Sequence, residues 1–164
     1  MSDLQVLRIT KSPEETQELG ATLGSLLLLG DVLLLTGDLG AGKTQFAKGI
    51  AVALGIKRPI TGPTFNLIFE YPAGDGGPVV LRHFDLYRLE NQEELQDIDY
   101  FGLLEDTVVS IVEWGDKFPQ ALPLDFLLID FEFVDENKRT LRLKAFGQRS
   151  QELLKTITEV FRGR

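Results

Sequence analysis

Eight consecutive residues, 37–44, have types and a spacing that suit phosphate chemistry. They read GDLGAGKT and fit the pattern GxxxxGK[ST] without a mismatch. Glycines let such a loop wrap closely around an anion, so that several backbone N–H groups point inward. We expect Lys43 to reach the β and γ phosphates of a nucleotide and the Thr44 hydroxyl to ligate Mg²⁺. The other loop residues predicted to bind the nucleotide are Asp38, Leu39, Gly40, Ala41 and Gly42.

Two acidic residues are candidates to complete a magnesium site, because Mg²⁺ usually takes a carboxylate as well as phosphate oxygens. Glu113 follows the apolar run VVSIV and precedes Trp114, and Asp85 lies in HFDLYR at the end of another apolar segment. Placing an acid beside a buried strand costs free energy, which favours a functional role over that of a solvated or helix-capping acid. Either could hold the metal or orient an attacking water, and the sequence leaves the division between them open.

Three further features lie near the expected site. The segment TGPTF (61–65) could carry Thr64 towards the γ phosphate, as switch segments do; the alternative is a proline turn that leads into a strand. His83 is the only histidine of a chain without cysteine, so we predict a structural role for it in preference to metal binding. Tyr87 and Arg88 are of residue types enriched at interfaces, and either could face a partner.

A strand and a helix must position the phosphate loop. Residues 31–36 (DVLLLT) form a short apolar run that is typical of a strand buried on both faces. The helix behind the loop is predicted to begin at about Thr44 and to end near Gly55. Its N-terminus adds partial positive charge where the phosphates would lie. The motif and its strand-to-helix setting therefore agree.

The elements before and after this unit complete the expected fold. A strand is predicted over 4–9, followed by a helix with Ser12 as N-cap, Pro13 at its first position and Glu15 closing a capping box. The buried face of that helix would comprise Leu19, Leu23, Leu26 and Leu27. Further strands are predicted over 65–71, 79–86, 107–112, 126–134 and 140–145, and helices over 91–98 and 151–161.

These elements predict an α/β fold, a P-loop NTPase-like domain of three layers. Its central sheet would be mixed, partly parallel near the phosphate loop and extended by antiparallel hairpin strands. A length of 164 residues suits one hydrophobic core, so we expect a single domain over 1–164.

Composition narrows the class of partner. The net charge of −8 disfavours non-specific nucleic-acid binding, although it does not exclude a local basic site. The first residues, MSDLQVLRIT, lack the features of a signal peptide. The longest apolar stretch, 26–35, is interrupted and too short to cross a bilayer. We therefore expect a cytoplasmic protein that does not contact the membrane.

Several segments together resemble the TsaE family, formerly called YjeE. They are GDLGAGKT, TGPTF, HFDLYRL with the following EEL, and VEWGDKFPQALP, and they occur in the same order over nearly the whole chain. The resemblance implies an ATPase, with ATP and Mg²⁺ as cofactors, that is required for the threonylcarbamoyladenosine modification of ANN-decoding tRNAs. It also implies TsaB and TsaD as protein partners, with tRNA contacted indirectly through them.

The same resemblance assigns roles to particular positions. Lys43 and Thr44 would bind phosphate and Mg²⁺, Glu113 would be the second magnesium position, and Asp85 the other functional acid. Regions that flank the nucleotide would include Ser12 or Pro13 near the first helix, and Lys138 or Arg139 in the last hairpin. Where the family usually has Ser-Pro-Thr, this chain has Gly62, Pro63 and Thr64, so a serine hydroxyl is missing and Thr61 is a possible substitute.

Two other classes of P-loop enzyme are alternatives to a TsaE-type ATPase. A P-loop kinase for a small metabolite would need an acceptor pocket and usually an arginine-rich lid, and the lysines and arginines here form no such cluster. A GTPase would need an NKxD signature, but the only Asn-Lys pair is followed by Arg139 and Thr140, so ATP is favoured. A nucleotide-gated binding module with very slow hydrolysis is compatible with the TsaE resemblance.

Overall fold

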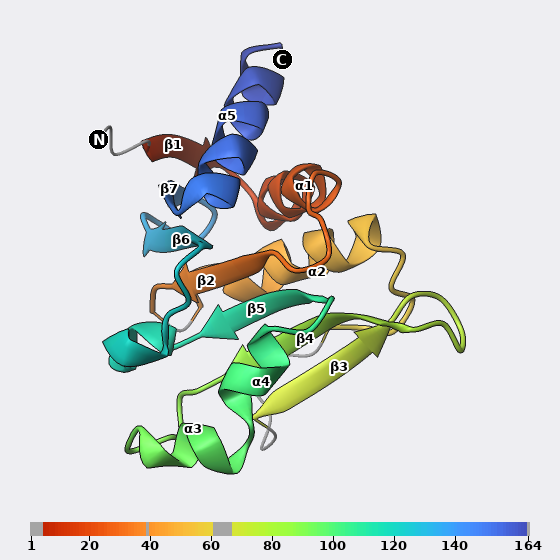
Figure 1. The fold of residues 1–164 in the computed structure, drawn as a ribbon. Coiled ribbons are helices and arrows are strands. Elements are labelled where there is room, and N and C mark those ends of the chain that lie inside the picture. The colour runs from red at the N-terminus through yellow and green to blue at the C-terminus, as the bar shows by residue number, and fades with distance from the viewer. Residues whose placement is uncertain (1–4, 39, 61–66, 164) are drawn as a thin grey trace.

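The computed structural model describes residues 5–38, 40–60 and 67–163. Its centre is a seven-stranded sheet in the order β1-β7-β6-β2-β5-β4-β3 (Figure 1). The strands are β1 (Gln5–Thr10), β2 (Val32–Thr36), β3 (Ile68–Pro72), β4 (Val79–Asp85), β5 (Val109–Glu113), β6 (Phe126–Phe133) and β7 (Arg139–Phe146).

The middle of the sheet is parallel and its edges are antiparallel. Strand β2 runs parallel to both β5 and β6, and β4 runs parallel to β5. The hairpin β3–β4 and the strands β6, β7 and β1 pair antiparallel. Four of the five residues of β2 are buried, as expected for a strand covered on both faces. The predicted mixed sheet is therefore confirmed.

Helices cover both faces of this sheet, which gives three layers (Figure 1). One apolar cluster joins β2, β5 and β6 to three helices through residues such as Leu23, Phe46 and Leu154. A second cluster, which includes Phe84 and Tyr100, lies on the opposite face. The first three helices are α1 (Pro13–Gly24), α2 (Lys43–Ala53) and α5 (Gln148–Arg162); the opposite face carries α3 (Glu93–Asp97), α4 (Tyr100–Leu104), η1 (Gly115–Lys117) and η2 (Pro119–Ala121).

Helix α1 begins where the sequence predicted and ends earlier. The Ser12 hydroxyl accepts a hydrogen bond from Glu15 N at 3.1 Å. The Glu15 carboxylate accepts from Lys11 N at 2.8 Å, one residue before the N-cap, so the capping box is not reciprocal. The helix ends at Gly24. The expectation that Leu26 and Leu27 lie on it was therefore wrong: both follow the helix, and Leu27 is buried from a turn.

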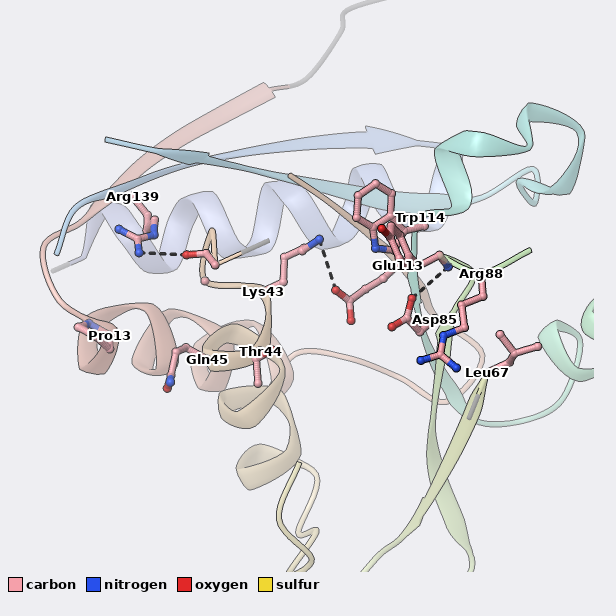
Figure 2. Close-up of a pocket in the computed structure, with 13 residues that line it drawn as sticks. Pro13, Lys43, Thr44, Gln45, Leu67, Asp85, Arg88, Glu113, Trp114 and Arg139 are labelled. Carbon is pink, nitrogen blue, oxygen red and sulfur yellow. Dashed lines mark hydrogen bonds and ion pairs between the residues drawn. The ribbon is translucent and has the colours of Figure 1, made fainter. Parts of the chain in front are cut away.

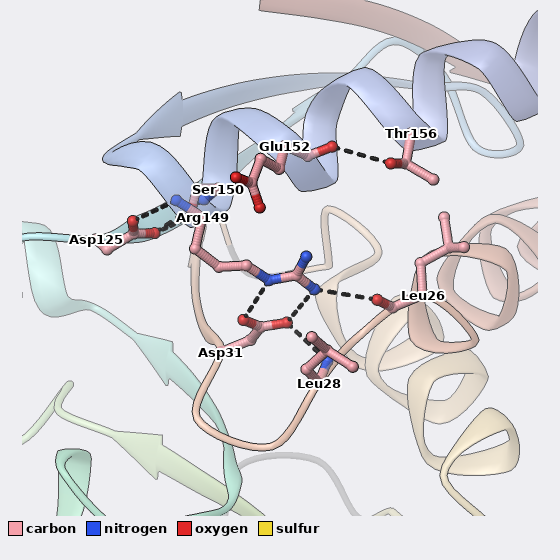
Figure 3. A network of polar contacts seen from close by, with 8 residues as sticks. All are labelled: Leu26, Leu28, Asp31, Asp125, Arg149, Ser150, Glu152 and Thr156. Atoms are coloured by element: carbon pink, nitrogen blue, oxygen red, sulfur yellow. Dashed lines mark hydrogen bonds and ion pairs between the residues drawn. The ribbon is translucent and has the colours of Figure 1, made fainter.

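The sequence predicted one further helix correctly, missed another and placed the start of a third too late. Helix α3 lies inside the predicted span, with Asn91 Oδ1 accepting from Glu94 N at 3.2 Å. Helix α4 was not predicted, and it follows Asp99, whose φ of 54° is left-handed. Helix α5 starts at Gln148, three residues before the predicted start. Asp125 explains that start, because its carboxylate accepts from the backbone N–H groups of Arg149 and Ser150 (Figure 3).

An ion pair ties α5 to the start of β2. Arg149 Nη2 lies 2.9 Å from Asp31 Oδ2, and Arg149 Nε donates to Asp31 Oδ1 at 3.0 Å. The same guanidinium donates to Leu26 O at 3.2 Å, so one side chain links three segments (Figure 3). Two parallel N–H···O bonds fix this geometry more firmly than a single one would.

Helices α1 and α2 are in backbone contact. A Cβ added at Gly49 would lie 1.9 Å from Gln17 O, and one added at Gly20 would lie 2.2 Å from Phe46 O. The absence of a side chain at both positions lets the helices pack this closely. Because α2 begins at Lys43, this contact also places the phosphate loop.

No helix among the described residues is long and apolar enough to cross a membrane.

We predict that Gly49→Ala lowers the free energy of unfolding by about 2 kcal/mol or more, since the added methyl group forces the two helices apart. Val52→Ala is the matched control on the same helix, because Val52 is 64% exposed; we expect it to change stability by less than about 0.5 kcal/mol. Urea denaturation of both variants measures the difference. Equal stability of the two variants would contradict the close contact.

Candidate functional site

The loop between β2 and α2 leaves the start of α2 open to an anion. Gly40 and Gly42 have φ values of 79° and 106°, a conformation that side-chain-bearing residues rarely adopt. Gly42 is the N-cap of α2, and among the described residues no side chain caps it. The first turn of α2 lines the cavity shown in Figure 2, and the N–H groups that begin a helix have no acceptor within it.

Lys43 is buried at the floor of this loop. Its side chain is 6% exposed, and Nζ donates to Gly37 O at 2.8 Å. The ammonium lies 3.6 Å from Glu113 Oε1 and 4.9 Å from the centre of the Trp114 ring. The carboxylate and the ring face both attract a cation. The loop therefore holds a cation in place (Figure 2).

Strand alternation brings the two candidate acids to one place. Asp85 and Glu113 are the last residues of β4 and β5, and they are paired in register in these parallel strands. Both lie on the face of the sheet that carries α2, because they alternate with Phe84 and Val112 of the opposite cluster. The ends of two parallel strands thus present two carboxylates to the phosphate loop.

His83, for which the sequence predicted a structural role, contacts the site through a hydrogen bond that the sequence did not reveal. It precedes Asp85 by two residues and therefore lies on the same face of β4. Its Nε2 is 2.5 Å from Glu113 Oε2, and its side chain is only 8% exposed. The sequence did hold a signal for this contact. In HFD, His83 and Asp85 are two residues apart and so share one face of a strand. Once β4 and β5 are known to be neighbours, this alternation puts the imidazole beside the two acids.

The charge state of Glu113 follows from its surroundings. Burial raises the pKa of Glu113, but the hydrogen bond with His83 and the charges of His83 and Lys43 outweigh burial, so its pKa lies below the ordinary value. Ionised at neutral pH, the carboxylate can only accept hydrogen bonds. The proton in the bond between the two side chains therefore belongs to His83 Nε2.

The segment after β4 is fixed against the site. Asp85 Oδ1 accepts from Tyr87 N at 3.1 Å, and the Tyr87 and Trp114 rings lie 5.0 Å apart. Lys117 Nζ donates to Tyr87 O and to Leu89 O, each at 2.8 Å. This arrangement leaves Tyr87 54% exposed at the edge of the site.

Arg139 connects the β6–β7 hairpin to the phosphate loop. Its Nη2 donates to Gly40 O at 3.1 Å, and its guanidinium lies 4.6 Å from the centre of the Phe133 ring. The region that the sequence marked as flanking the nucleotide thus touches the loop directly. Lys138, the alternative in the same hairpin, donates its backbone N–H to Asp135 at 2.8 Å and does not line the pocket.

A single cavity of about 460 Å³ gathers most of the predicted site residues. Three of them lie elsewhere: the Ser12 hydroxyl caps α1, Ala41 is buried in the loop, and Asp38 lines a separate depression across β2. Leu39 and Thr64, together with Gly62, lie outside the described residues. The predicted residues that line the cavity are Gly40, Gly42, Lys43, Thr44, Asp85, Glu113, Arg139 and Pro13.

The oxygen donors around this cavity suit Mg²⁺, which also takes phosphate and water ligands, better than they suit a metal bound by protein side chains alone. In the described part of the chain, no group of three or more His, Cys, Asp or Glu residues could hold a metal. The cavity instead combines the Thr44 hydroxyl with the carboxylates of Asp85 and Glu113. Mg²⁺ is commonly bound by one or two carboxylates, with substrate phosphates and waters as the remaining ligands.

Comparison with known proteins assigns the chain to a family. Residues 10–141 match the family described as threonylcarbamoyl adenosine biosynthesis protein TsaE. The chain belongs to the TsaE family. The resemblance inferred from the sequence is therefore confirmed, and with it membership of a family that acts in the biosynthesis of tRNA threonylcarbamoyladenosine.

Individual TsaE proteins match over most of their length. The protein from Bacillus subtilis is 36% identical over 149 residues, which cover 91% of each chain. That from Nostoc sp. is 38% identical and covers 87% of this chain and 88% of its own. The crystal structure of YdiB from Bacillus subtilis superposes with a TM-score of 0.79 at 33% identity, over 97% of both chains. The TsaE fold is thus shared throughout.

We predict that ionised Glu113 stabilises this TsaE-family chain in a pH-dependent way. Because its pKa is lower in the folded state, its contribution is complete above the ordinary glutamate pKa of about 4.3 and is lost as the pH falls through the lower, folded value. The free energy of unfolding of wild type should therefore fall more steeply below about pH 5 than that of Glu113→Gln. Exposed Glu132→Gln is the control and should keep the wild-type slope. If the free energy of unfolding fell with the same slope below about pH 5 in wild type and Glu113→Gln, the lowered pKa of Glu113 would be contradicted.

Proposed function

We propose that this chain binds ATP with Mg²⁺ in the 460 Å³ cavity and hydrolyses the terminal phosphate. One observation supports this most strongly: the buried ammonium of Lys43, the uncapped N-terminus of α2 and the carboxylates of Asp85 and Glu113 face the same space. The ammonium and the N–H groups match phosphate, and the carboxylates match a divalent metal.

The side chains divide the work as follows. Lys43 exchanges Gly37 O for oxygens of the β and γ phosphates and offsets their charge. The Thr44 hydroxyl, Asp85 and Glu113 would hold Mg²⁺ and its waters. When bound, the metal would neutralise charge that develops on the phosphate oxygens. One of the two carboxylates orients the water that attacks the γ phosphorus in line with the leaving oxygen.

We further propose that the chain acts with TsaB and TsaD in the threonylcarbamoyladenosine modification of ANN-decoding tRNAs in the cytoplasm. A net charge of −8 suits a protein that meets tRNA through partners and does not grip it directly. Tyr87 and Arg88, beside the nucleotide cavity, are the residues through which a partner could sense its contents. A small-molecule kinase is the alternative that the experiment below separates.

Lys43→Ala should lower ATP hydrolysis by roughly a hundredfold or more, because it removes the cation at the transferred phosphate. Lys57→Ala removes the same group from the surface, where the side chain is 69% exposed, and should keep the wild-type rate. Hydrolysis is measured as phosphate release with and without TsaB and TsaD, and chelation of Mg²⁺ should abolish it.

The measurements with TsaB and TsaD distinguish a partner-dependent ATPase from a small-molecule kinase. Stimulation of hydrolysis by TsaB and TsaD, together with tRNA modification over many turnovers, would support the proposed role. Hydrolysis that ignores the partners, with modification that does not need the chain, would contradict it and point to a small-molecule acceptor. Wild-type hydrolysis by Lys43→Ala would refute the site itself.

A further inference from the structure

His83 is placed to control the direction of the Glu113 carboxylate. It lies in the interior of β4, paired with Ile111 of β5 and with Phe69 of β3. From this position the ring reaches diagonally to Glu113, two residues beyond Ile111, and Nε2 meets Oε2 at 2.5 Å. The Phe69 ring, 6.5 Å away between centroids, packs against the same imidazole. Neighbouring strands therefore fix the histidine before it meets the acid.

The two oxygens of Glu113 have different partners. Oε2 faces His83 and Oε1 faces Lys43 at 3.6 Å. The backbone is held as well, because Glu113 ends β5 and its carbonyl accepts a hydrogen bond from Leu86 N at 3.0 Å. If Lys43 turns towards a phosphate, His83 remains as the group that holds the carboxylate. Without that hydrogen bond, the side-chain torsions of Glu113 could rotate away from the cavity.

We propose that His83 is a positioning residue, which holds Glu113 through Nε2–H···Oε2 so that its carboxylate faces the Mg²⁺ of the bound nucleotide. The proposal rests on the proposed nucleotide function. Groups that orient a metal-binding carboxylate typically contribute ten- to a hundredfold to metal affinity. A histidine suits the task, because its rigid ring spans the gap between two strands with few torsions to fix.

A purely space-filling role for His83 would lead to different mutational effects. A buried histidine that only fills space could be replaced by any side chain of similar volume without a specific effect on Mg²⁺. A positioning histidine requires the donor. His83→Leu keeps much of the volume and removes the donor, whereas His83→Gln retains an N–H donor the same number of bonds from Cβ. Phe69→Leu disturbs the packing on the imidazole and leaves the bond to Glu113 in place.

The first arm of the test needs no nucleotide. His83 is the only histidine, so the imidazole N–H region of the NMR spectrum reports this residue alone. We expect a strongly downfield Nε2 proton in the wild type, as a short charge-assisted hydrogen bond produces. Glu113→Gln should move it upfield and Phe69→Leu should not. A proton resonance unaffected by Glu113→Gln would overturn the proposal.

The second arm measures Mg²⁺ dependence. Trp114 is the only tryptophan and lines the cavity, so its fluorescence reports nucleotide binding. In His83→Leu, the gain in ATP affinity on adding Mg²⁺ should fall about tenfold or more, while ATP affinity in chelator stays within about twofold, since Lys43 and the loop are intact. His83→Gln should recover most of the gain and Phe69→Leu should keep it.

The outcomes separate this inference from the proposed function. An unchanged Mg²⁺ effect in His83→Leu, with wild type binding ATP, would overturn the positioning role and leave the nucleotide site standing. Absence of ATP binding in wild type would overturn both. If His83→Leu fails to fold, His83→Gln and the NMR measurement still test the proposal. The Mg²⁺ effect on ATP affinity is then compared in His83→Gln and Glu113→Gln. An equal loss in the two variants would count against the proposal.

Discussion

The ammonium of Lys43 lies 2.8 Å from Gly37 O and 3.6 Å from Glu113 Oε1, with a side chain that is 6% exposed. A charge buried to this extent requires partners that are already in place, because desolvation is repaid only by fixed opposite charge and hydrogen bonds. Those partners come from the loop after β2 and from the last residue of β5. The rest of the structure keeps these segments together.

Three long-range contacts serve this purpose. The parallel pairing of β2 with β5 sets Glu113 opposite Leu35, two residues before Gly37. The side-chain-free contact between α1 and α2 at Gly20 and Gly49 sets where α2, and hence Lys43, begins. Arg139 then joins the far hairpin to Gly40 O. Each contact links segments that are distant in sequence, so the site is a property of the whole domain and not of the loop alone.

This arrangement explains which features could be predicted from the sequence. The loop motif, the burial of β2 and the acids at strand ends depend on local residue types, and the predicted three-layer fold followed from them. The hydrogen bond of His83 could not be predicted, because its partner Glu113 lies 30 residues away on another strand, and strand order cannot be read from one segment. The end of α1 and the existence of α4 were missed for a related reason. Asp99, in a left-handed conformation, precedes α4, a backbone state that the residue types do not reveal. Leu27 is buried although it follows α1, so tertiary packing and not the helix accounts for its place in the apolar pattern.

The proposed site puts the phosphates of the nucleotide at Lys43. The decisive measurement is a crystal structure of the chain with Mg²⁺ and a non-hydrolysable ATP analogue. We expect the β and γ phosphates at the N-terminus of α2, Lys43 Nζ moved from Gly37 O to a phosphate oxygen, and the metal between Thr44 and the carboxylates of Asp85 and Glu113. A nucleotide bound elsewhere, or a Lys43 that stays on Gly37 O while the phosphates are bound, would contradict it.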